Sequence, residues 1–160
     1  MNDAHYHLVV NHFPIIGTIF GLGICIAGIV FKNKSYLKVA YSVFIVAAIF
    51  TALSMTTGEG AEEIVEEMPS VGEQIIHEHE EIAEKLALVL YILAVVSILG
   101  LYTQIKNHAK AKLVSYLVVI IAIIGVFLAQ KVGTTGGEIR HTEIRKDYNP
   151  NQIAPVEEDD

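Results

Sequence analysis

Histidines are the side chains of this sequence most suited to binding a metal ion or a haem. Imidazole is the commonest metal ligand in proteins and a usual axial ligand of haem iron. Of the seven histidines, only His108 lies among lysines. The other six lie on one side of the predicted membrane topology: His5, His7, His12, His77, His79 and His141. A structural role does not require this asymmetry, which therefore indicates a ligand site. Solvation at a helix start is the alternative for His5, His7 and His77.

His12 is the most informative of these residues because it lies inside the first apolar segment, between Asn11 and Phe13. An ionisable side chain within a membrane span is costly and usually marks a functional site that faces the bundle interior. We therefore expect His12 to be a ligand or to handle protons, and a satisfied core histidine is the alternative. Pro14 either kinks a helix that has already begun or occupies the first turn of one that begins near Asn11.

His77 and His79 precede the third apolar segment, in a stretch with the pattern of a helix. At about 100° per residue their side chains point in nearly opposite directions, so they cannot both bind one ion. His79 shares its face with apolar residues such as Ile76 and Ile82, which favours His79 as the inward one of the pair. His141 follows glycines that allow a sharp turn back over the bundle mouth, and an exposed position is the alternative. The candidate cofactor ligands are His12, His79, His141 and His77.

Glutamates add oxygen donors on the same side. Many of them lie in the connection between the second and third apolar segments, on both sides of Pro69. The candidate donors for a metal ion are His12, His79, His141, Glu59, Glu62, Glu81 and Glu138. A carboxylate-bridged di-iron site requires two Glu-x-x-His motifs, and only the sequence from Glu138 to His141 has that spacing. A solvated acidic surface is the simplest alternative for the glutamates.

The elements that must position these side chains are membrane-spanning helices. Hydrophobic residues make up 52% of the sequence and charged residues only 18%, against about 25% charged in soluble domains. A hydrocarbon core of roughly 30 Å is crossed by about 20 apolar residues of helix. Four segments meet that requirement: Leu8 to Phe31, Val39 to Met55, Leu86 to Ile105 and Leu113 to Ala129. The predicted fold is an all-α integral membrane four-helix bundle.

The charge argues against a nucleic-acid partner, and the cysteine content excludes an internal disulfide. The net charge is −7 and no cluster of lysine or arginine is present, which argues against a nucleic-acid partner. Cys25 is the only cysteine and lies in an apolar run, so an internal disulfide is impossible and a packing role is expected.

Lysines predict the orientation of the bundle. The turns at 32–38 and 106–112 carry three lysines each, whereas the segment before Leu8 and the connection from Thr57 to Glu84 have no lysine or arginine. By the positive-inside rule both turns face the cytoplasm, and both termini lie on the outer side of the membrane. The basic residues near the carboxyl end oppose this orientation, but four spans place both termini on one side.

The two halves of the sequence resemble copies of one helical hairpin, at about 5–58 and 77–136. Each begins with a His-x-His pair, continues through a span, a lysine turn and a second span, and ends in Thr-Thr-Gly. Parallel repeats of this kind are related by an axis along the membrane normal. Chance recurrence of short glycine motifs at helix ends is the alternative. We assign 1–145 to one transmembrane domain and expect the acidic tail at 146–160 to be disordered.

The sequence resembles a bacterial family of small four-span membrane proteins, a domain of unknown function that is sometimes fused to c-type cytochrome modules. The matching motifs are the sequence from His12 to Ile15, a histidine at the start of the third span (His77 or His79), and the sequence from Gly136 to His141. The resemblance extends to about Arg145 and implies a haem-associated redox context. This sequence lacks the His-Pro pair expected before the first span, and it has no Cys-x-x-Cys-His motif for covalent haem attachment.

The leading functional hypothesis is a small b-type cytochrome-like accessory protein that holds non-covalent haem through histidines such as His12, His79 and His141. With its histidines on one side, such a protein would exchange electrons with a quinol or a periplasmic redox protein. It would therefore be an accessory subunit more than a complete enzyme. One alternative is a periplasmic-side site for Zn, Cu or Fe. Another is a structural role in the lipid bilayer, as a homo-oligomer or a subunit of a larger complex, packed through small residues such as Gly17 and Gly21.

Overall fold

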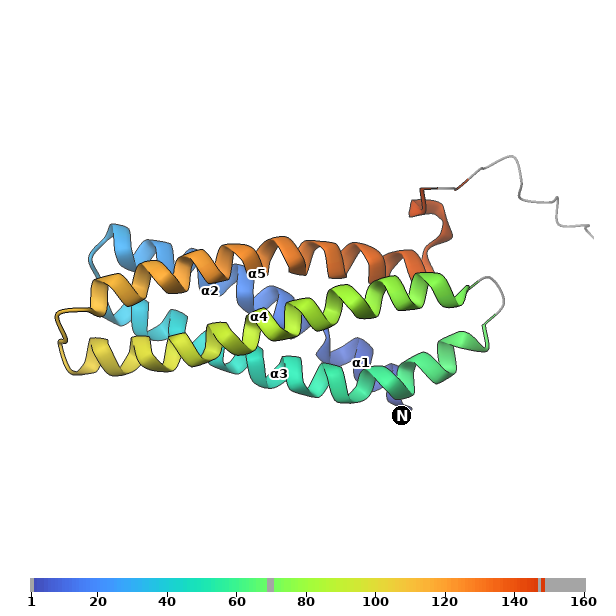
Figure 1. Cartoon of the computed structure of the whole chain (residues 1–160), viewed down its shortest axis with the longest axis horizontal. Helices are drawn as coiled ribbons and strands as arrows, with labels where there is room; N and C mark the ends of the chain where they lie inside the picture. Colours follow the sequence, from blue (N-terminus) through green and yellow to red (C-terminus); the bar gives the residue numbers. More distant parts are fainter. Residues whose placement is uncertain (1, 69–70, 147, 149–160) are drawn as a thin grey trace, which may run out of the picture.

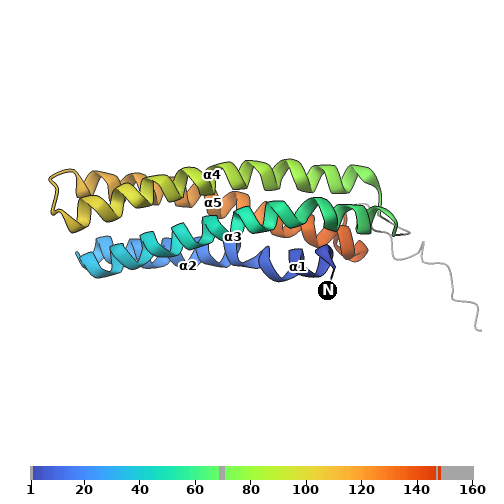
Figure 2. The same cartoon turned by 90° about the horizontal axis from the view of Figure 1, so that it is seen from below.

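The structure is a computed structural model that describes residues 2–68, 71–146 and 148. The regular elements of these residues are all helical: α1 (Asp3–Val10), α2 (His12–Val30), α3 (Lys34–Glu66), α4 (Glu73–Ile105), α5 (Ala111–Arg140) and the short 3₁₀ helix η1 (Thr142–Ile144). Figures 1 and 2 show them as one elongated bundle, in which α1 and α2 together form the first of four long rods. The predicted all-α four-helix bundle is confirmed.

The surface of the bundle is that of a membrane protein. Among the described residues, four helical segments are long and apolar enough to cross a bilayer: 3–30, Lys34–Glu66, Glu73–Ile105 and Ala111–Arg140. Large apolar side chains remain exposed on every one of them, for example Phe20, Val46, Val95 and Phe127. Exposed apolar side chains in such number on every helix are typical of a surface that contacts lipid or another protein. The chain is a multi-pass membrane protein.

The core is built from side chains on all four long rods. Cys25, Phe44, Leu90 and Val118 are almost completely buried in it. Close helix contact depends on small residues, since a Cβ built on Gly21 would lie within 2.9 Å of the Phe44 ring. Cys25 is a buried packing residue, as its place in an apolar run predicts.

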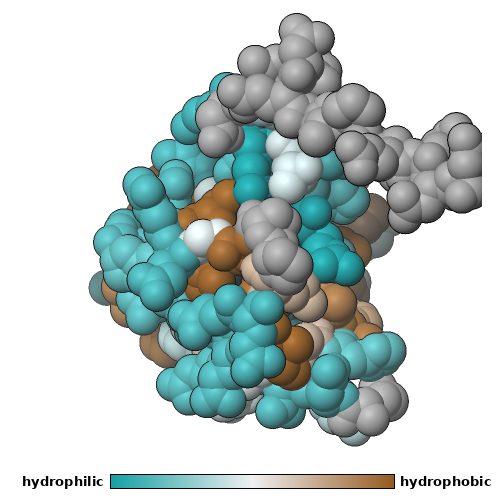
Figure 3. Space-filling model, turned by 90° about the vertical axis from the view of Figure 1, so that its right-hand side faces the viewer, coloured by the Kyte–Doolittle hydropathy of each residue, from teal (hydrophilic) through white to brown (hydrophobic). Residues whose placement is uncertain are grey.

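The two turns with lysines lie at the same end of the bundle, which we call the lysine end (Figure 1). The amino terminus, the α3–α4 connection and the end of α5 lie at the opposite end, which we call the histidine end because His5, His7, His12, His77, His79 and His141 belong to it. Hydrophilic side chains cover most of the histidine end, with hydrophobic ones visible between them (Figure 3). The predicted acidic tail at 146–160 lies almost entirely outside the described residues.

Both turns at the lysine end are closed by the same backbone motif. The N–H of Asn33 donates to the Gly28 carbonyl and the N–H of His108 donates to the Thr103 carbonyl, at 2.9 Å in each case. Each of these hydrogen bonds joins residues five apart, as in a Schellman motif. In this motif the residue before the N–H donor has a left-handed backbone conformation. Lys32 and Asn107 occupy that position, each with φ of 51°.

We expect Lys32→Gly to stabilise the folded protein by about 1 kcal/mol, because a lysine side chain strains left-handed backbone and glycine does not. Asn107→Gly is the matched control and should give a smaller gain, since asparagine tolerates this conformation. The midpoint of thermal unfolding in detergent measures both. A lower midpoint for Lys32→Gly than for the parent protein would contradict the expectation.

Candidate functional site

The first hairpin holds His7 of α1 against the second half of α3. The imidazole is half-buried, and its Nδ1 donates to the Ser54 carbonyl at 3.1 Å. The same nitrogen lies 3.3 Å from Oγ1 of Thr57, whose own hydroxyl hydrogen donates to the Leu53 carbonyl. Because a carbonyl only accepts, the hydrogen of the neutral ring is on Nδ1. The lone pair of His7 Nε2 is therefore available for another partner.

The second hairpin holds His79 of α4 against the end of α5 in a similar way. Nδ1 of the half-buried ring lies 3.0 Å from Oγ1 of Thr135. The Thr135 hydroxyl donates to the Lys131 carbonyl at 3.1 Å, so its oxygen accepts from the imidazole. As in His7, this leaves a lone pair on Nε2. The hydroxyl thus fixes both the tautomer and the orientation of the His79 ring.

The two contacts correspond within the repeated sequence. His7 and His79 are each the second histidine of a His-x-His pair, and Thr57 and Thr135 are each the second threonine of a Thr-Thr-Gly group. The glycines of those groups lie beside the rings. A Cβ built on Gly58 would be 3.8 Å from Cε1 of His7, whereas one on Gly136 would be 3.0 Å from Cε1 of His79.

His7 and His79 also lie near each other, although they belong to different hairpins. Helix α3 packs against both α1 and α4, and the two imidazoles are close enough for their charges to interact. We call these two side chains the imidazole pair. Sequence reasoning selected His79 and did not select His7. The signal that points to His7 is its match to His79 within the repeat.

Asn11 has an unsatisfied acceptor near His7. It follows His7 by one turn, as the C-cap residue of α1. Its buried Oδ1 has no hydrogen-bond partner among the residues that the structure describes. Buried polar atoms are normally paired, so this oxygen is an exception for which the described residues supply no hydrogen-bond donor.

His12 lies at the first turn of α2, inside the membrane-length segment 3–30. Helix α1 ends at Val10, and Pro14 occupies the first turn of the new helix, where its missing N–H is tolerated. The side chain of His12 is exposed, and Nδ1 donates to the Leu8 carbonyl at 3.0 Å. It was expected to face the bundle interior; the break at Asn11 instead leaves it on the surface, near enough to His7 for their charges to interact.

His77 and His141 are exposed and pair with nearby carboxylates. Nε2 of His77 lies 3.5 Å from Oε1 of Glu81, and the other oxygen of that carboxylate, Oε2, accepts from Lys85. His141 follows the end of α5, and its Nδ1 lies 2.9 Å from Oε1 of Glu143. A hydrogen bond to its own backbone and the contact with His141 lower the pKa of Glu143. Neither histidine joins the imidazole pair through a contact in the described residues.

The glutamates proposed as metal donors are dispersed. Glu59 and Glu81 are exposed, and Glu138 is half-buried near the end of α5. Glu62 is half-buried beside Glu80 and close to His77. Within the part of the chain that the structure describes, no three histidine, cysteine, aspartate or glutamate side chains are arranged to hold a metal ion.

The arrangement that remains is two oriented imidazoles with free Nε2 lone pairs, one from each hairpin. Two imidazoles are the number of protein ligands that a six-coordinate haem iron needs. Comparisons of the chain with protein-family models, curated proteins and solved structures found no match. The family resemblance described above therefore stays a prediction from short motifs.

Proposed function

We propose that the protein is a small membrane redox accessory protein that binds non-covalent b-type haem between His7 and His79. The observation that supports this function is the imidazole pair, in which Thr57 with Ser54 and Thr135 hold the two rings by Nδ1. Hydrogen bonds of this kind orient a metal-binding histidine and raise the basicity of its other nitrogen. The second nitrogen is the one that would bind iron.

The number of protein donors favours haem over a bare metal ion. A structural zinc ion takes four protein ligands, whereas haem iron receives four nitrogens from its macrocycle and needs at most two more. Two side chains therefore suffice for haem. Ile76, one turn before His79, is almost fully buried, and Ala61 of α3 is buried at the same end of the bundle. These apolar groups suit a largely apolar macrocycle, and helical bundles commonly hold cofactors between facing helices.

The chain's own residues would have two roles at this site. His7 and His79 would bind the iron, and Thr57 and Thr135 would keep the rings in place. Bound haem would supply one-electron transfer. His12 would remain at the rim, where its exposed ring is accessible to a partner.

The position of the pair defines the proposed partners. At the lysine end His108 is exposed, and its Nδ1 accepts from the backbone N–H of Lys110. It therefore offers no second haem site there, and electrons would be exchanged on one side only. By the positive-inside rule that side is the periplasm of a bacterial inner membrane. A membrane quinol or a periplasmic redox protein would be the partner.

Absorption spectra of the detergent-purified protein test this function directly. After addition of haem and removal of the excess, the oxidised protein should show a Soret band, and dithionite should produce the sharp bands of a six-coordinate b-type haem. A monodisperse protein that retains no haem would contradict the proposal. Elemental analysis that finds stoichiometric Zn, Cu or Fe without haem would instead support the alternative of a periplasmic-side metal site.

The proposed orientation can be tested separately by cysteine labelling in a Cys25→Ala background. Ser35 and Glu78 are both exposed, at the lysine end and the histidine end respectively. In spheroplasts an impermeant maleimide should label Glu78→Cys strongly and Ser35→Cys only after lysis. The reverse pattern would place the imidazole pair in the cytoplasm and remove the periplasmic partner from the proposal.

A further inference from the structure

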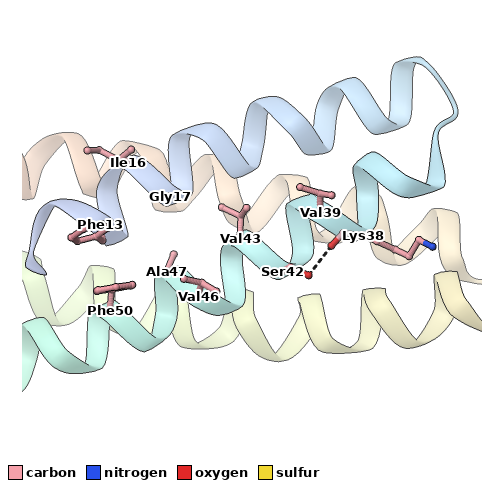
Figure 4. Close-up of a pocket in the computed structure, with 10 residues that line it drawn as sticks. All are labelled: Phe13, Ile16, Gly17, Lys38, Val39, Ser42, Val43, Val46, Ala47 and Phe50. Atoms are coloured by element: carbon pink, nitrogen blue, oxygen red, sulfur yellow. Dashed lines mark hydrogen bonds between the residues drawn. The ribbon is translucent and has the colours of Figure 1, made fainter.

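A groove of about 480 Å³ runs along the outer surface of the bundle between α2 and α3. Figure 4 shows Phe13 and Phe50 at one end of it and Lys38 at the other. Apart from Lys38 and Ser42, its lining is formed by apolar residues and glycine. Because the groove opens on the apolar surface of a membrane protein, its natural occupant comes from the bilayer.

Small residues create the groove. Gly17 and Ala47 face each other across its floor, and a Cβ built on Gly17 would lie only 3.1 Å from the Cβ of Ala47. The helices therefore approach closely there with no large side chain to fill the surface. Ile16 and Val46 line the groove and are each about half exposed, at 49% and 50%. The stacked rings of Phe13 and Phe50, 4.4 Å apart, close it towards the histidine end.

A positive charge lies at the open end of this apolar groove. The Lys38 side chain is exposed, and its ammonium makes no hydrogen bond or ion pair with the residues that the structure describes. The nearby Ser42 hydroxyl donates to the Lys38 carbonyl at 3.1 Å and is therefore already engaged. An apolar groove with one free ammonium at its mouth is complementary to an amphiphile with an anionic head.

The length of the groove matches one leaflet of a bilayer. From Lys38 to Phe50 helix α3 covers about 18 Å, at about 1.5 Å per residue. Half of a hydrocarbon core of roughly 30 Å is about 15 Å. An acyl chain that starts at the level of Lys38 would therefore end at the two stacked phenylalanine rings.

We propose that this groove binds an anionic glycerophospholipid from the leaflet at the lysine end. One acyl chain lies between α2 and α3, and the headgroup phosphate pairs with Lys38. A quinone would fill the apolar part but has no charge for Lys38 to neutralise. The proposal is independent of haem binding, because the groove shares no residue with the imidazole pair.

Native mass spectrometry of the detergent-solubilised protein tests the proposal with two added lipids of identical acyl chains, phosphatidylglycerol and phosphatidylcholine. We expect one phosphatidylglycerol molecule to be retained about fivefold better than phosphatidylcholine. A ratio of about this size is expected from the attraction of one lysine to an anionic lipid. Lys38→Gln should remove this preference. Lys106→Gln, which removes a lysine at the same end outside the groove, should keep it.

A second pair of variants tests the groove itself. Val46→Trp would fill it, whereas Val95→Trp makes the same change on α4, where Val95 is 67% exposed and outside the groove. Only Val46→Trp should reduce retention of both lipids, by fivefold or more. Equal retention in all variants would overturn the proposal. So would a dimer that only Val46→Trp abolishes, because the occupant would then be a second copy of the chain.

Discussion

His7→Ala and His79→Ala are each expected to abolish stable haem binding. Each variant removes one of the two imidazoles that the hairpins hold by Nδ1. The haem would then keep one protein ligand and would no longer be bonded to the hairpin that carries the substitution. Haem occupancy should fall at least tenfold, because even the loss of a residue that only hydrogen-bonds to a metal ligand typically lowers metal affinity about tenfold or more. The measurement is haem per folded protein, for variants that elute as the parent protein does in size-exclusion chromatography.

Matched controls exist in both hairpins. His5→Ala and His77→Ala remove the exposed histidine two residues earlier on the same helices, and both should retain full occupancy. Added imidazole should partly restore the six-coordinate spectrum of His79→Ala if His79 is a ligand, whereas a merely structural role gives no rescue. Full occupancy in either His7→Ala or His79→Ala would remove that residue from the site.

His12→Ala separates two hypotheses. The sequence pattern, an ionisable residue within an apolar span, predicts that His12→Ala loses the cofactor. The structure places His12 on the surface at the start of α2, and its Nδ1 is bonded to its own helix turn. On that geometry we expect most of the haem to remain bound. Electron transfer from a quinol, which would approach at the rim, is the property that His12→Ala should slow.

Hydropathy located the four spans because it measures the contact with lipid, but it did not give the lengths of the helices. The second span was expected to end at Met55, whereas α3 continues to Glu66. The extension is polar on one side and packs Ala61 on the other, so it is an amphipathic helix outside the apolar segment. For the same reason α4 begins at Glu73, well before Leu86.

The candidate site was predictable in part, and the limits have a physical origin. The apolar face around Ile76 predicted that His79 points inward, and the His79 ring is half-buried against Thr135. His7 belongs to a short helix without a buried residue, so no periodicity distinguished it from His5. Its inward position depends on Ser54 and Thr57, which are distant in sequence. His12 was misplaced because the sequence alone left two positions open for Pro14, and only the break at Asn11 decides between them.

The glycines beside the imidazole pair give the sharpest test of its geometry. We expect Gly136→Ala to weaken haem binding about tenfold, within the range found for outer-shell changes at metal sites. The new Cβ would lie 3.0 Å from Cε1 and 3.4 Å from Nδ1 of His79, so the ring must shift by a few tenths of an ångström from the position in which it contacts Thr135. Haem titration followed at the Soret band measures the change in affinity.

Gly58→Ala is the corresponding change in the first hairpin, and it should leave haem affinity unchanged. Its Cβ would lie 3.8 Å from Cε1 of His7, which is an ordinary van der Waals contact. Both glycines lie inside helices, where alanine adds about 0.5–1 kcal/mol of stability. Neither variant should therefore lose helix stability, and a loss of haem from Gly136→Ala alone reports the position of the His79 ring. Equal affinities for the two variants would show that Gly136 and the ring beside it lie outside the haem site.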